Sequence, residues 1–217
     1  MTRPASPAIG SHRAASGEPV VHVIDDDPSI RGAIDSLLRS VDLRTASYGS
    51  TAAFLAAEPD DAPGCLLLDV RLPRVSGLDF QAQMAAHGIR IPVIMMTAHG
   101  DIPMSVRAMR AGAVDFLTKP FRDQDLIDAI ARAIEQDRRR RAEDAAHADL
   151  RRRHATLSHR EREVMALVSD GRLNKQVAFE LGVSEITIKL HRASAMRKMG
   201  ARTLPDLVRM VERLKPD

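Results

Sequence analysis

The feature that most constrains this chain is a short apolar run that ends on an acid. Residues 65–68 read Cys-Leu-Leu-Leu, Asp69 follows directly, and Pro73 comes four residues later. A short apolar run bounded by turn residues indicates a buried strand, and open α/β sheets bind ligands beyond the carboxyl ends of their strands. Asp69 is therefore a candidate for chemistry, although an Asp that only caps a helix or opens a turn explains the same pattern.

Strand and helix signals alternate along residues 18–133, which predicts the fold class of this region. Val20–Ile24 is a β-branched run of the kind found in central parallel strands. Further strands are expected at about 43–47, 65–69, 91–97 and 113–117, and helices at about 28–41, 51–57, 78–86 and 103–111. Five alternations predict an α/β domain with a (βα)5 doubly wound parallel sheet, whose strand order stays open.

Polar residues follow four of these strands. Because crossovers in a parallel sheet are right-handed, the carboxyl ends of its strands meet at one edge. The residues expected there are Asp25, Asp26, Asp69, Thr97 and Lys119. Each alone also fits a turn, a strand position or the surface. Adjacent carboxylates raise each other's pKa unless a cation lies between them, and carboxylate oxygens suit Mg²⁺. The sequence therefore predicts a magnesium site at this edge.

The motifs around these residues resemble the receiver domain of two-component response regulators. They are Val23–Asp27 (VIDDD), Leu68–Pro73 (LDVRLP), Thr97–Asp101 (TAHGD) and Asp115–Phe121 (DFLTKPF). The four motifs occur in order at strand ends, and the resemblance covers about residues 18–133. It implies the flavodoxin-like receiver fold.

The resemblance also implies a role for each site residue. Asp69 would accept a phosphoryl group, and Thr97 and Lys119 would bind its oxygens. The implied Mg²⁺ ligands are Asp25, Asp26, Asp69 and the backbone carbonyl of Arg71. The Lys119–Pro120 bond is expected to be cis, and Thr97 and Phe116 to act as the switch pair, although the family often has Tyr where this chain has Phe116. An ionised Asp has no proton to lose, so phosphoryl transfer needs positioning and charge neutralisation but no general base.

The second half of the chain is more basic than the first. Residues 18–133 hold 11 Lys and Arg against 16 Asp and Glu, a net of −5, whereas residues 134–217 hold 19 against 13, a net of +6. A basic half suggests a polyanionic partner, although ordinary solvated charge explains the same count. Residues 134–154 are charged and rich in Ala, and are expected to form a solvated, helical linker, with contact to DNA phosphates as the alternative. Residues 1–17 are expected to form a flexible tail.

Residues 155–217 are expected to form a small all-α domain of three helices. Ser158 and Glu161 have the spacing of a capping box. A second helix is expected at 174–181, and Ser184 opens a third. Only Gly182 and Val183 separate these two helices, which is the short glycine turn of a helix-turn-helix. Basic residues on the third helix either keep the protein soluble or enter the DNA major groove.

This region resembles the DNA-binding domain of the LuxR, NarL and FixJ regulators. The matching motifs are 157–164, 174–182 and 184–199. The resemblance implies that base edges contact Lys189, Leu190, Arg192 and Ala193. It also implies contacts to phosphate, or a positioning role, for Asn174, Lys175, Thr187 and Lys198.

Both resemblances together indicate a response regulator of the FixJ type rather than an enzyme, at most with self-phosphorylation from small donors and slow dephosphorylation. A sensor histidine kinase would phosphorylate Asp69, and the change would favour a homodimer that binds promoter DNA, with RNA polymerase as a further partner. No apolar run approaches the ~20 residues of a membrane helix, so a cytoplasmic protein is expected.

Two alternatives remain from the sequence. A Mg²⁺-dependent phosphatase of the dehalogenase type also uses a strand-end Asp, but places a second Asp two residues later, where this chain has Arg71. A receiver-like protein that binds DNA constitutively is the other.

Overall fold

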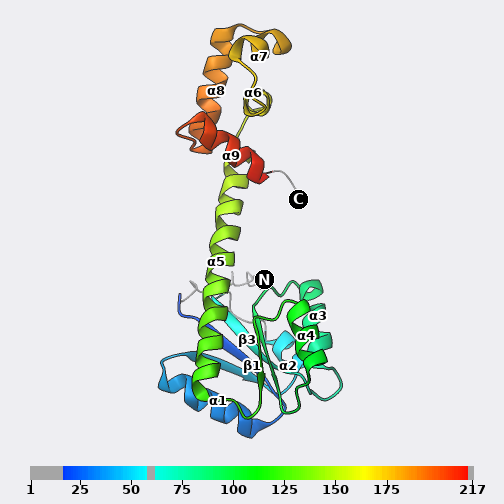
Figure 1. Cartoon of the computed structure of the whole chain (residues 1–217). Coiled ribbons are helices and arrows are strands. Elements are labelled where there is room, and N and C mark those ends of the chain that lie inside the picture. Colours follow the sequence, from blue (N-terminus) through cyan, green and yellow to red (C-terminus); the bar gives the residue numbers. More distant parts are fainter. Residues whose placement is uncertain (1–16, 58–61, 215–217) are drawn as a thin grey trace, which may run out of the picture. The chain divides into compact units, whose positions relative to one another are not determined.

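The computed structural model describes residues 17–57 and 62–214, which form two compact units. The N-terminal unit ends at Arg140, and the C-terminal unit begins at Arg141. Figure 1 shows the elements of both units, which are described separately below. The expected flexible tail, residues 1–17, lies outside the described residues except for Gly17.

The N-terminal unit is a five-stranded parallel sheet with helices on both faces. Its elements are β1(Val20–Ile24), α1(Pro28–Ser40), β2(Arg44–Tyr48), α2(Thr51–Ala56), β3(Gly64–Asp69), α3(Gly77–Gln83), η1(Met84–His87), β4(Val93–Thr97), α4(Ile102–Arg110), β5(Asp115–Thr118) and the first part of α5(Asp123–Ala155). The strand order is β2-β1-β3-β4-β5, and every neighbouring pair is parallel. The predicted α/β fold class is confirmed, and the strand order that the sequence left open is now defined.

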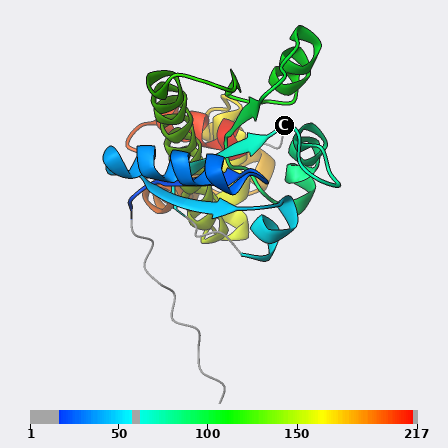
Figure 2. The same ribbon diagram turned by 90° about the horizontal axis from the view of Figure 1, so that it is seen from below.

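Two apolar layers hold these helices on the sheet. One layer packs α1 and α5 against residues such as Val23 and Leu67, and the other packs α2, α3 and α4 against residues such as Ile24 and Leu68. Figure 2 shows α1 and α5 on one side of the strands and α2 to α4 on the other. Helices cover both faces of β1, β3 and β4, so every residue of these strands is buried, as expected of central parallel strands.

The register of the sheet brings the strand ends level with one another. Ile24 pairs with Leu68, and Asp69 pairs with Met96. Thr97 in turn pairs with Thr118, the residue before Lys119. The side chains that follow these pairs therefore lie along one edge of the sheet, which is where the sequence placed the candidate site.

Helix α5 extends through the expected linker, and buried residues occur near both ends of this linker segment. At its start, Ile134 and Asp137 are buried in the N-terminal unit, where Asp137 Oδ2 accepts a hydrogen bond from the Gly64 N–H at 3.1 Å. Near its end, Leu150 is buried in the core of the C-terminal unit. The surrounding Arg and Ala residues hid these two contacts in the sequence, because they weaken the apolar periodicity of the helix.

The C-terminal unit is all-helical, and it has one helix more than expected. It contains α6(His159–Ser169), α7(Asn174–Leu181), α8(Glu185–Met199) and α9(Leu204–Leu214) as well as the end of α5. The capping box of Ser158 and Glu161 is present, and Gly182 is left-handed at the turn between α7 and α8. Helix α9 buries Leu207, and it corrects the expectation of three helices. Thr203 and Asp206, three residues apart, were a capping signal in the sequence, and in the structure they exchange reciprocal hydrogen bonds at the start of α9.

The end of α5 is expected to stabilise the C-terminal unit. Leu150 is buried, and Arg153 Nη1 donates to the carbonyl oxygen of Met199 at the end of α8 at 3.1 Å. A fragment of residues 141–217 should therefore be more stable than one of residues 155–217 by about 2 kcal/mol, the value of one buried Leu side chain. Thermal unfolding followed by circular dichroism measures the difference. Leu150→Ala in the longer fragment should reproduce most of the loss, and equal stability of both fragments would contradict this role.

Within the described residues, helices that combine the length and the apolar character needed to cross a lipid bilayer do not occur.

Candidate functional site

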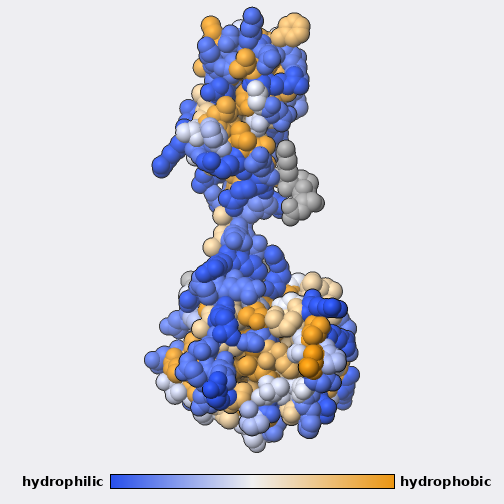
Figure 3. Space-filling model, in the orientation of Figure 1, coloured by the Kyte–Doolittle hydropathy of each residue, from blue (hydrophilic) through white to orange (hydrophobic). Residues whose placement is uncertain are grey.

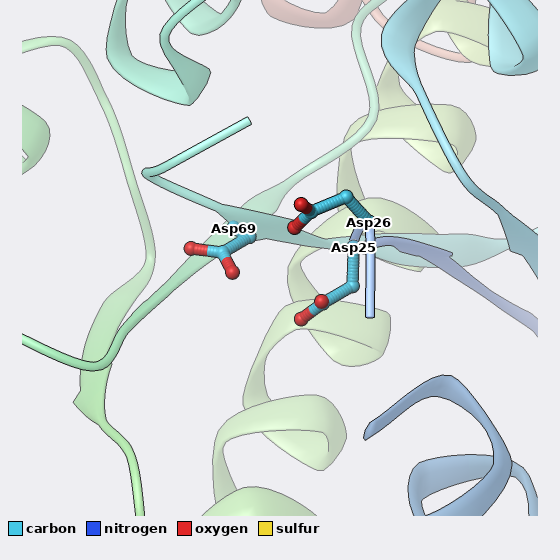
Figure 4. Close-up of side chains that lie close together, drawn as sticks. All are labelled: Asp25, Asp26 and Asp69. Atoms are coloured by element: carbon cyan, nitrogen blue, oxygen red, sulfur yellow. The ribbon is translucent and has the colours of Figure 1, made fainter. Parts of the chain in front are cut away.

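The three acidic side chains expected to bind a metal lie close together. Asp25 follows β1 directly, and Asp69 is the last residue of β3. Asp25 is fully buried and Asp69 is 6% exposed, whereas Asp26 is exposed. One carboxylate oxygen from each lies within 4.8 Å of the others, and Figure 4 shows the three groups beside one another. Such a set of hard oxygen donors fits Mg²⁺.

Lys119 supplies a positive charge between two of these acids. Its Nζ donates to Asp25 Oδ2 and to Asp69 Oδ2, both at 2.6 Å. Burial raises the pKa of Asp25, and the hydrogen bond from Lys119 opposes that shift. Burial alone would lower the pKa of Lys119, but the hydrogen bonds to Asp25 and Asp69 outweigh it and raise the pKa. Lys119 therefore remains an ammonium ion and balances part of the negative charge.

The other residues expected at this edge lie around the acids. Thr97 ends β4 and is fully buried, and its Oγ1 accepts the His99 N–H at 3.3 Å. The Arg71 N–H donates to Asp69 Oδ1 at 3.0 Å. Phe116 on β5 is half-buried in the second apolar layer. The Lys119–Pro120 bond is cis, as expected.

Gly77 is a residue of this site that the sequence reasoning missed. A Cβ at this position would lie 2.1 Å from the Asp69 carbonyl oxygen, and the Gly77 N–H donates to the Val70 carbonyl at 2.9 Å. The start of α3 therefore rests directly on the backbone that carries Asp69. Its position after the Pro73 loop and at the start of a helix was the only sequence signal.

The helix-turn-helix residues fall into two groups. The residues of the first group are exposed: Lys175 on α7, and Lys189, Leu190 and Ala193 on α8. Internal hydrogen bonds engage the others: Arg192 Nη1 donates to Asn174 Oδ1 at 3.3 Å, the Thr187 N–H donates to Ser184 Oγ at 3.1 Å, and Lys198 Nζ lies 2.6 Å from Glu161 Oε2. The structure thus presents the first group outward, whereas Arg192 connects α8 to α7, Lys198 connects α8 to α6, and the Thr187 N–H takes part in the cap of α8.

Glu161 joins three parts of the C-terminal unit, although the sequence predicted only a capping role for it. Its carboxylate accepts the Ser158 N–H at 2.7 Å, the Ser194 hydroxyl at 2.7 Å and Lys198 Nζ at 2.6 Å. The Lys198 hydrogen bond, together with those from Ser158 and Ser194, lowers the pKa of Glu161 to about 2. The charged carboxylate therefore fixes α8 against the start of α6.

We expect Glu161→Gln to destabilise the chain by about 2 kcal/mol at neutral pH, because charge-assisted hydrogen bonds are lost. The folded-state pKa of about 2 lies below the usual value of 4.5. The stabilisation is thus present above about pH 4.5 and is lost as the pH falls towards 2. Urea unfolding at several pH values measures both effects. As the pH falls from about 4.5 towards 2, the free energy of unfolding of Glu161→Gln should therefore decrease less than that of the wild type.

Glu163→Gln is the matched control, because Glu163 forms only surface ion pairs with His159 and Arg160. It should keep the stability and the pH profile of the wild type. A Glu161→Gln protein with an unchanged acid profile would contradict the buried ionic contact.

Known protein families match both units of the chain. Residues 21–131 match the family described as the response regulator receiver domain, and residues 155–211 match the bacterial regulatory proteins of the luxR family. The chain therefore belongs to the response regulators that join a receiver domain to a LuxR-type DNA-binding domain. These are the transcriptional regulators of two-component systems.

Individual relatives span nearly the whole chain. Nodulation protein W of Bradyrhizobium diazoefficiens is 52% identical over 94% of this chain and 90% of its own length. Response regulator protein TmoT of Ectopseudomonas mendocina is 44% identical over 95% and 94%. Among solved structures, response regulator StyR is 42% identical with a TM-score of 0.81, over 90% of this chain and 99% of that chain. Full-length FixJ from B. japonicum is 39% identical with a TM-score of 0.55, over 93% and 98%.

Proposed function

We propose that Asp69 accepts a phosphoryl group from a sensor histidine kinase and that this transfer controls promoter binding by the C-terminal unit. The observation that carries the proposal is the contact of Lys119 Nζ with both Asp25 and Asp69 at 2.6 Å, beside a third acid. Asp69 thus lies at the end of a strand, in contact with the ammonium group of Lys119. The neighbouring carboxylates offer oxygen donors for a second cation. This arrangement suits in-line transfer to a carboxylate.

The transfer forms a bond between an Asp69 carboxylate oxygen and phosphorus while the bond from phosphorus to the kinase histidine breaks. A carboxylate attacks as an anion without losing a proton, so the step needs no base. Mg²⁺ held by Asp25, Asp26, Asp69 and the Arg71 carbonyl would neutralise charge on the transferring group. Lys119 and the Thr97 hydroxyl would bind its remaining oxygens.

The proposed switch joins Thr97 to Phe116. A Cβ at Gly100 would lie 2.9 Å from the Phe116 ring and 3.0 Å from the Thr97 methyl, so both side chains border the same glycine. A phosphoryl group adds charge and acceptor oxygens that Thr97 can follow. Movement of Thr97 would change the space next to Phe116, and the loop before α4 would shift with it.

Dimerisation after phosphorylation would use the surface of α4. Ile102, Val106 and Met109 lie along one side of this helix and are 80%, 43% and 48% exposed. Figure 3 shows a line of hydrophobic side chains over α4 with hydrophilic residues along its outer side. A symmetric dimer would bind two half-sites of promoter DNA. RNA polymerase would be a further partner of the bound dimer. The protein would act in the cytoplasm.

The test compares full-length protein with and without beryllofluoride and Mg²⁺, which mimic the phosphorylated state. Fragmented genomic DNA is mixed with each sample, and the bound fragments are sequenced. The proposal expects a common sequence to be enriched more strongly with beryllofluoride. Equal enrichment in both samples would identify a constitutive DNA-binding protein instead. A separate assay with a chromogenic phosphate ester tests for a phosphatase, which steady hydrolysis of the ester would identify.

A further inference from the structure

The outward face of α8 begins with two large aliphatic side chains. Ile188 is fully buried in the core of the C-terminal unit. At 3.6 residues per turn, Ile186 and Leu190 point to the side opposite Ile188, and they are 71% and 67% exposed. Ala193 and Arg197 continue the same line at helical spacing, and both are exposed. An apolar stripe one turn long therefore occupies the start of this face.

Exposed charged residues lie beside the stripe. Lys189 lies next to Leu190 on α8, and Lys175 lies on α7, and both are exposed. Arg192, in contrast, is half-buried and donates to Asn174. The outward face thus combines an apolar centre with charges of both signs, Lys189 beside Leu190 and the exposed Glu185 beside Ile186. The match of residues 155–211 to the luxR family makes DNA the partner of this helix, and the major groove offers base edges and thymine methyl groups to apolar side chains.

We propose that Ile186 and Leu190 read thymine methyl groups in the major groove. Thymine is the base that presents a methyl group there, and apolar side chains are its usual partners. The inference rests on the proposed promoter binding and adds to it the base that this face recognises. Ile186 stands in the first turn of α8, the part of a recognition helix that comes closest to base edges.

The probe is a DNA duplex that the full-length protein, treated with beryllofluoride and Mg²⁺, selects from a randomised pool. Each thymine of this duplex is replaced in turn by deoxyuridine, which removes the methyl group and leaves the hydrogen-bonding edge unchanged. Binding of the wild type should weaken about fourfold at the thymines that contact Ile186 and Leu190, which is the value of one buried methyl group.

Variants assign each methyl group to a side chain. In Ile186→Ala the deoxyuridine penalty should disappear at one thymine position of the half-site, and in Leu190→Ala at another. Both side chains are exposed, so neither variant should alter the fold, and circular dichroism checks this. Phe179→Ala is the matched control, because Phe179 is 91% exposed on α7 and lies outside the stripe. It should keep the wild-type pattern of penalties.

The outcomes separate this inference from the function on which it rests. A selected sequence without any deoxyuridine penalty, or with penalties that both Ala variants retain, overturns thymine reading and leaves promoter binding intact. The stripe would then serve a protein partner. A protein that selects no sequence at all overturns the proposed promoter binding and this inference with it.

Discussion

Replacing Asp69 by Asn is expected to abolish phosphoryl uptake by this chain. The amide has no anionic oxygen to attack phosphorus, and the neighbouring Asp25 is fully buried and bonded to Lys119. Mass spectrometry of the intact protein, after incubation with a small phosphoryl donor and Mg²⁺, should show one added phosphoryl group on the wild type and none on the variant. In the wild type, the phosphoryl donor should increase the enrichment of promoter DNA. In the variant, this increase should be absent.

The control is Asp79→Asn, which removes an acid of the same unit from outside the site. Asp79 lies on α3, and its side chain is 52% exposed and paired with Arg107. This variant should take up the phosphoryl group as the wild type does. If Asp69→Asn is still phosphorylated, peptide mapping would assign the group to another carboxylate, and the acceptor proposed above would be wrong.

The central part of the sheet was predictable because burial on both faces leaves a simple pattern. Strands β1, β3 and β4 are apolar runs, and their ends were placed within two residues. The edge strands β2 and β5 are half-exposed and have weaker signals, and their bounds shifted by one or two residues as well. The alternation of strands and helices alone did not predict the strand order, because right-handed crossovers allow more than one order. The resemblance to receiver domains implied the flavodoxin-like order that the structure has.

The polar residues at the strand ends were predictable for the same topological reason, but their contacts were not. Nothing in the sequence sets the 2.6 Å distances of Lys119 from two acids, because these depend on the loop after β5. On α8, composition treats all basic residues alike. The structure distinguishes them by their rotation relative to the buried Ile188, so that Lys189 is exposed while Arg192 and Lys198 form internal contacts.

Replacing Gly77 by Ala is expected to destabilise the N-terminal unit and to slow phosphoryl uptake. The new Cβ would lie 2.1 Å from the Asp69 carbonyl oxygen and 3.1 Å from the Val70 Cα. Both are backbone atoms, so they cannot rotate away as a side chain would, and either the start of α3 or the end of β3 has to move. We expect a loss of about 3 kcal/mol in the free energy of unfolding, measured by urea unfolding of the full-length chain.

Gly32→Ala is the matched control for this substitution. Gly32 lies inside α1, where a Cβ would meet no atom within 4 Å. Because Ala favours a helix interior, this variant should gain about 0.5–1 kcal/mol and keep the wild-type rate of uptake. Wild-type stability and uptake in Gly77→Ala would contradict the close approach of the two backbones. A stability loss with an unchanged rate would show that α3 gives way while the strand end holds Asp69 in place, so the two measurements together locate the movement.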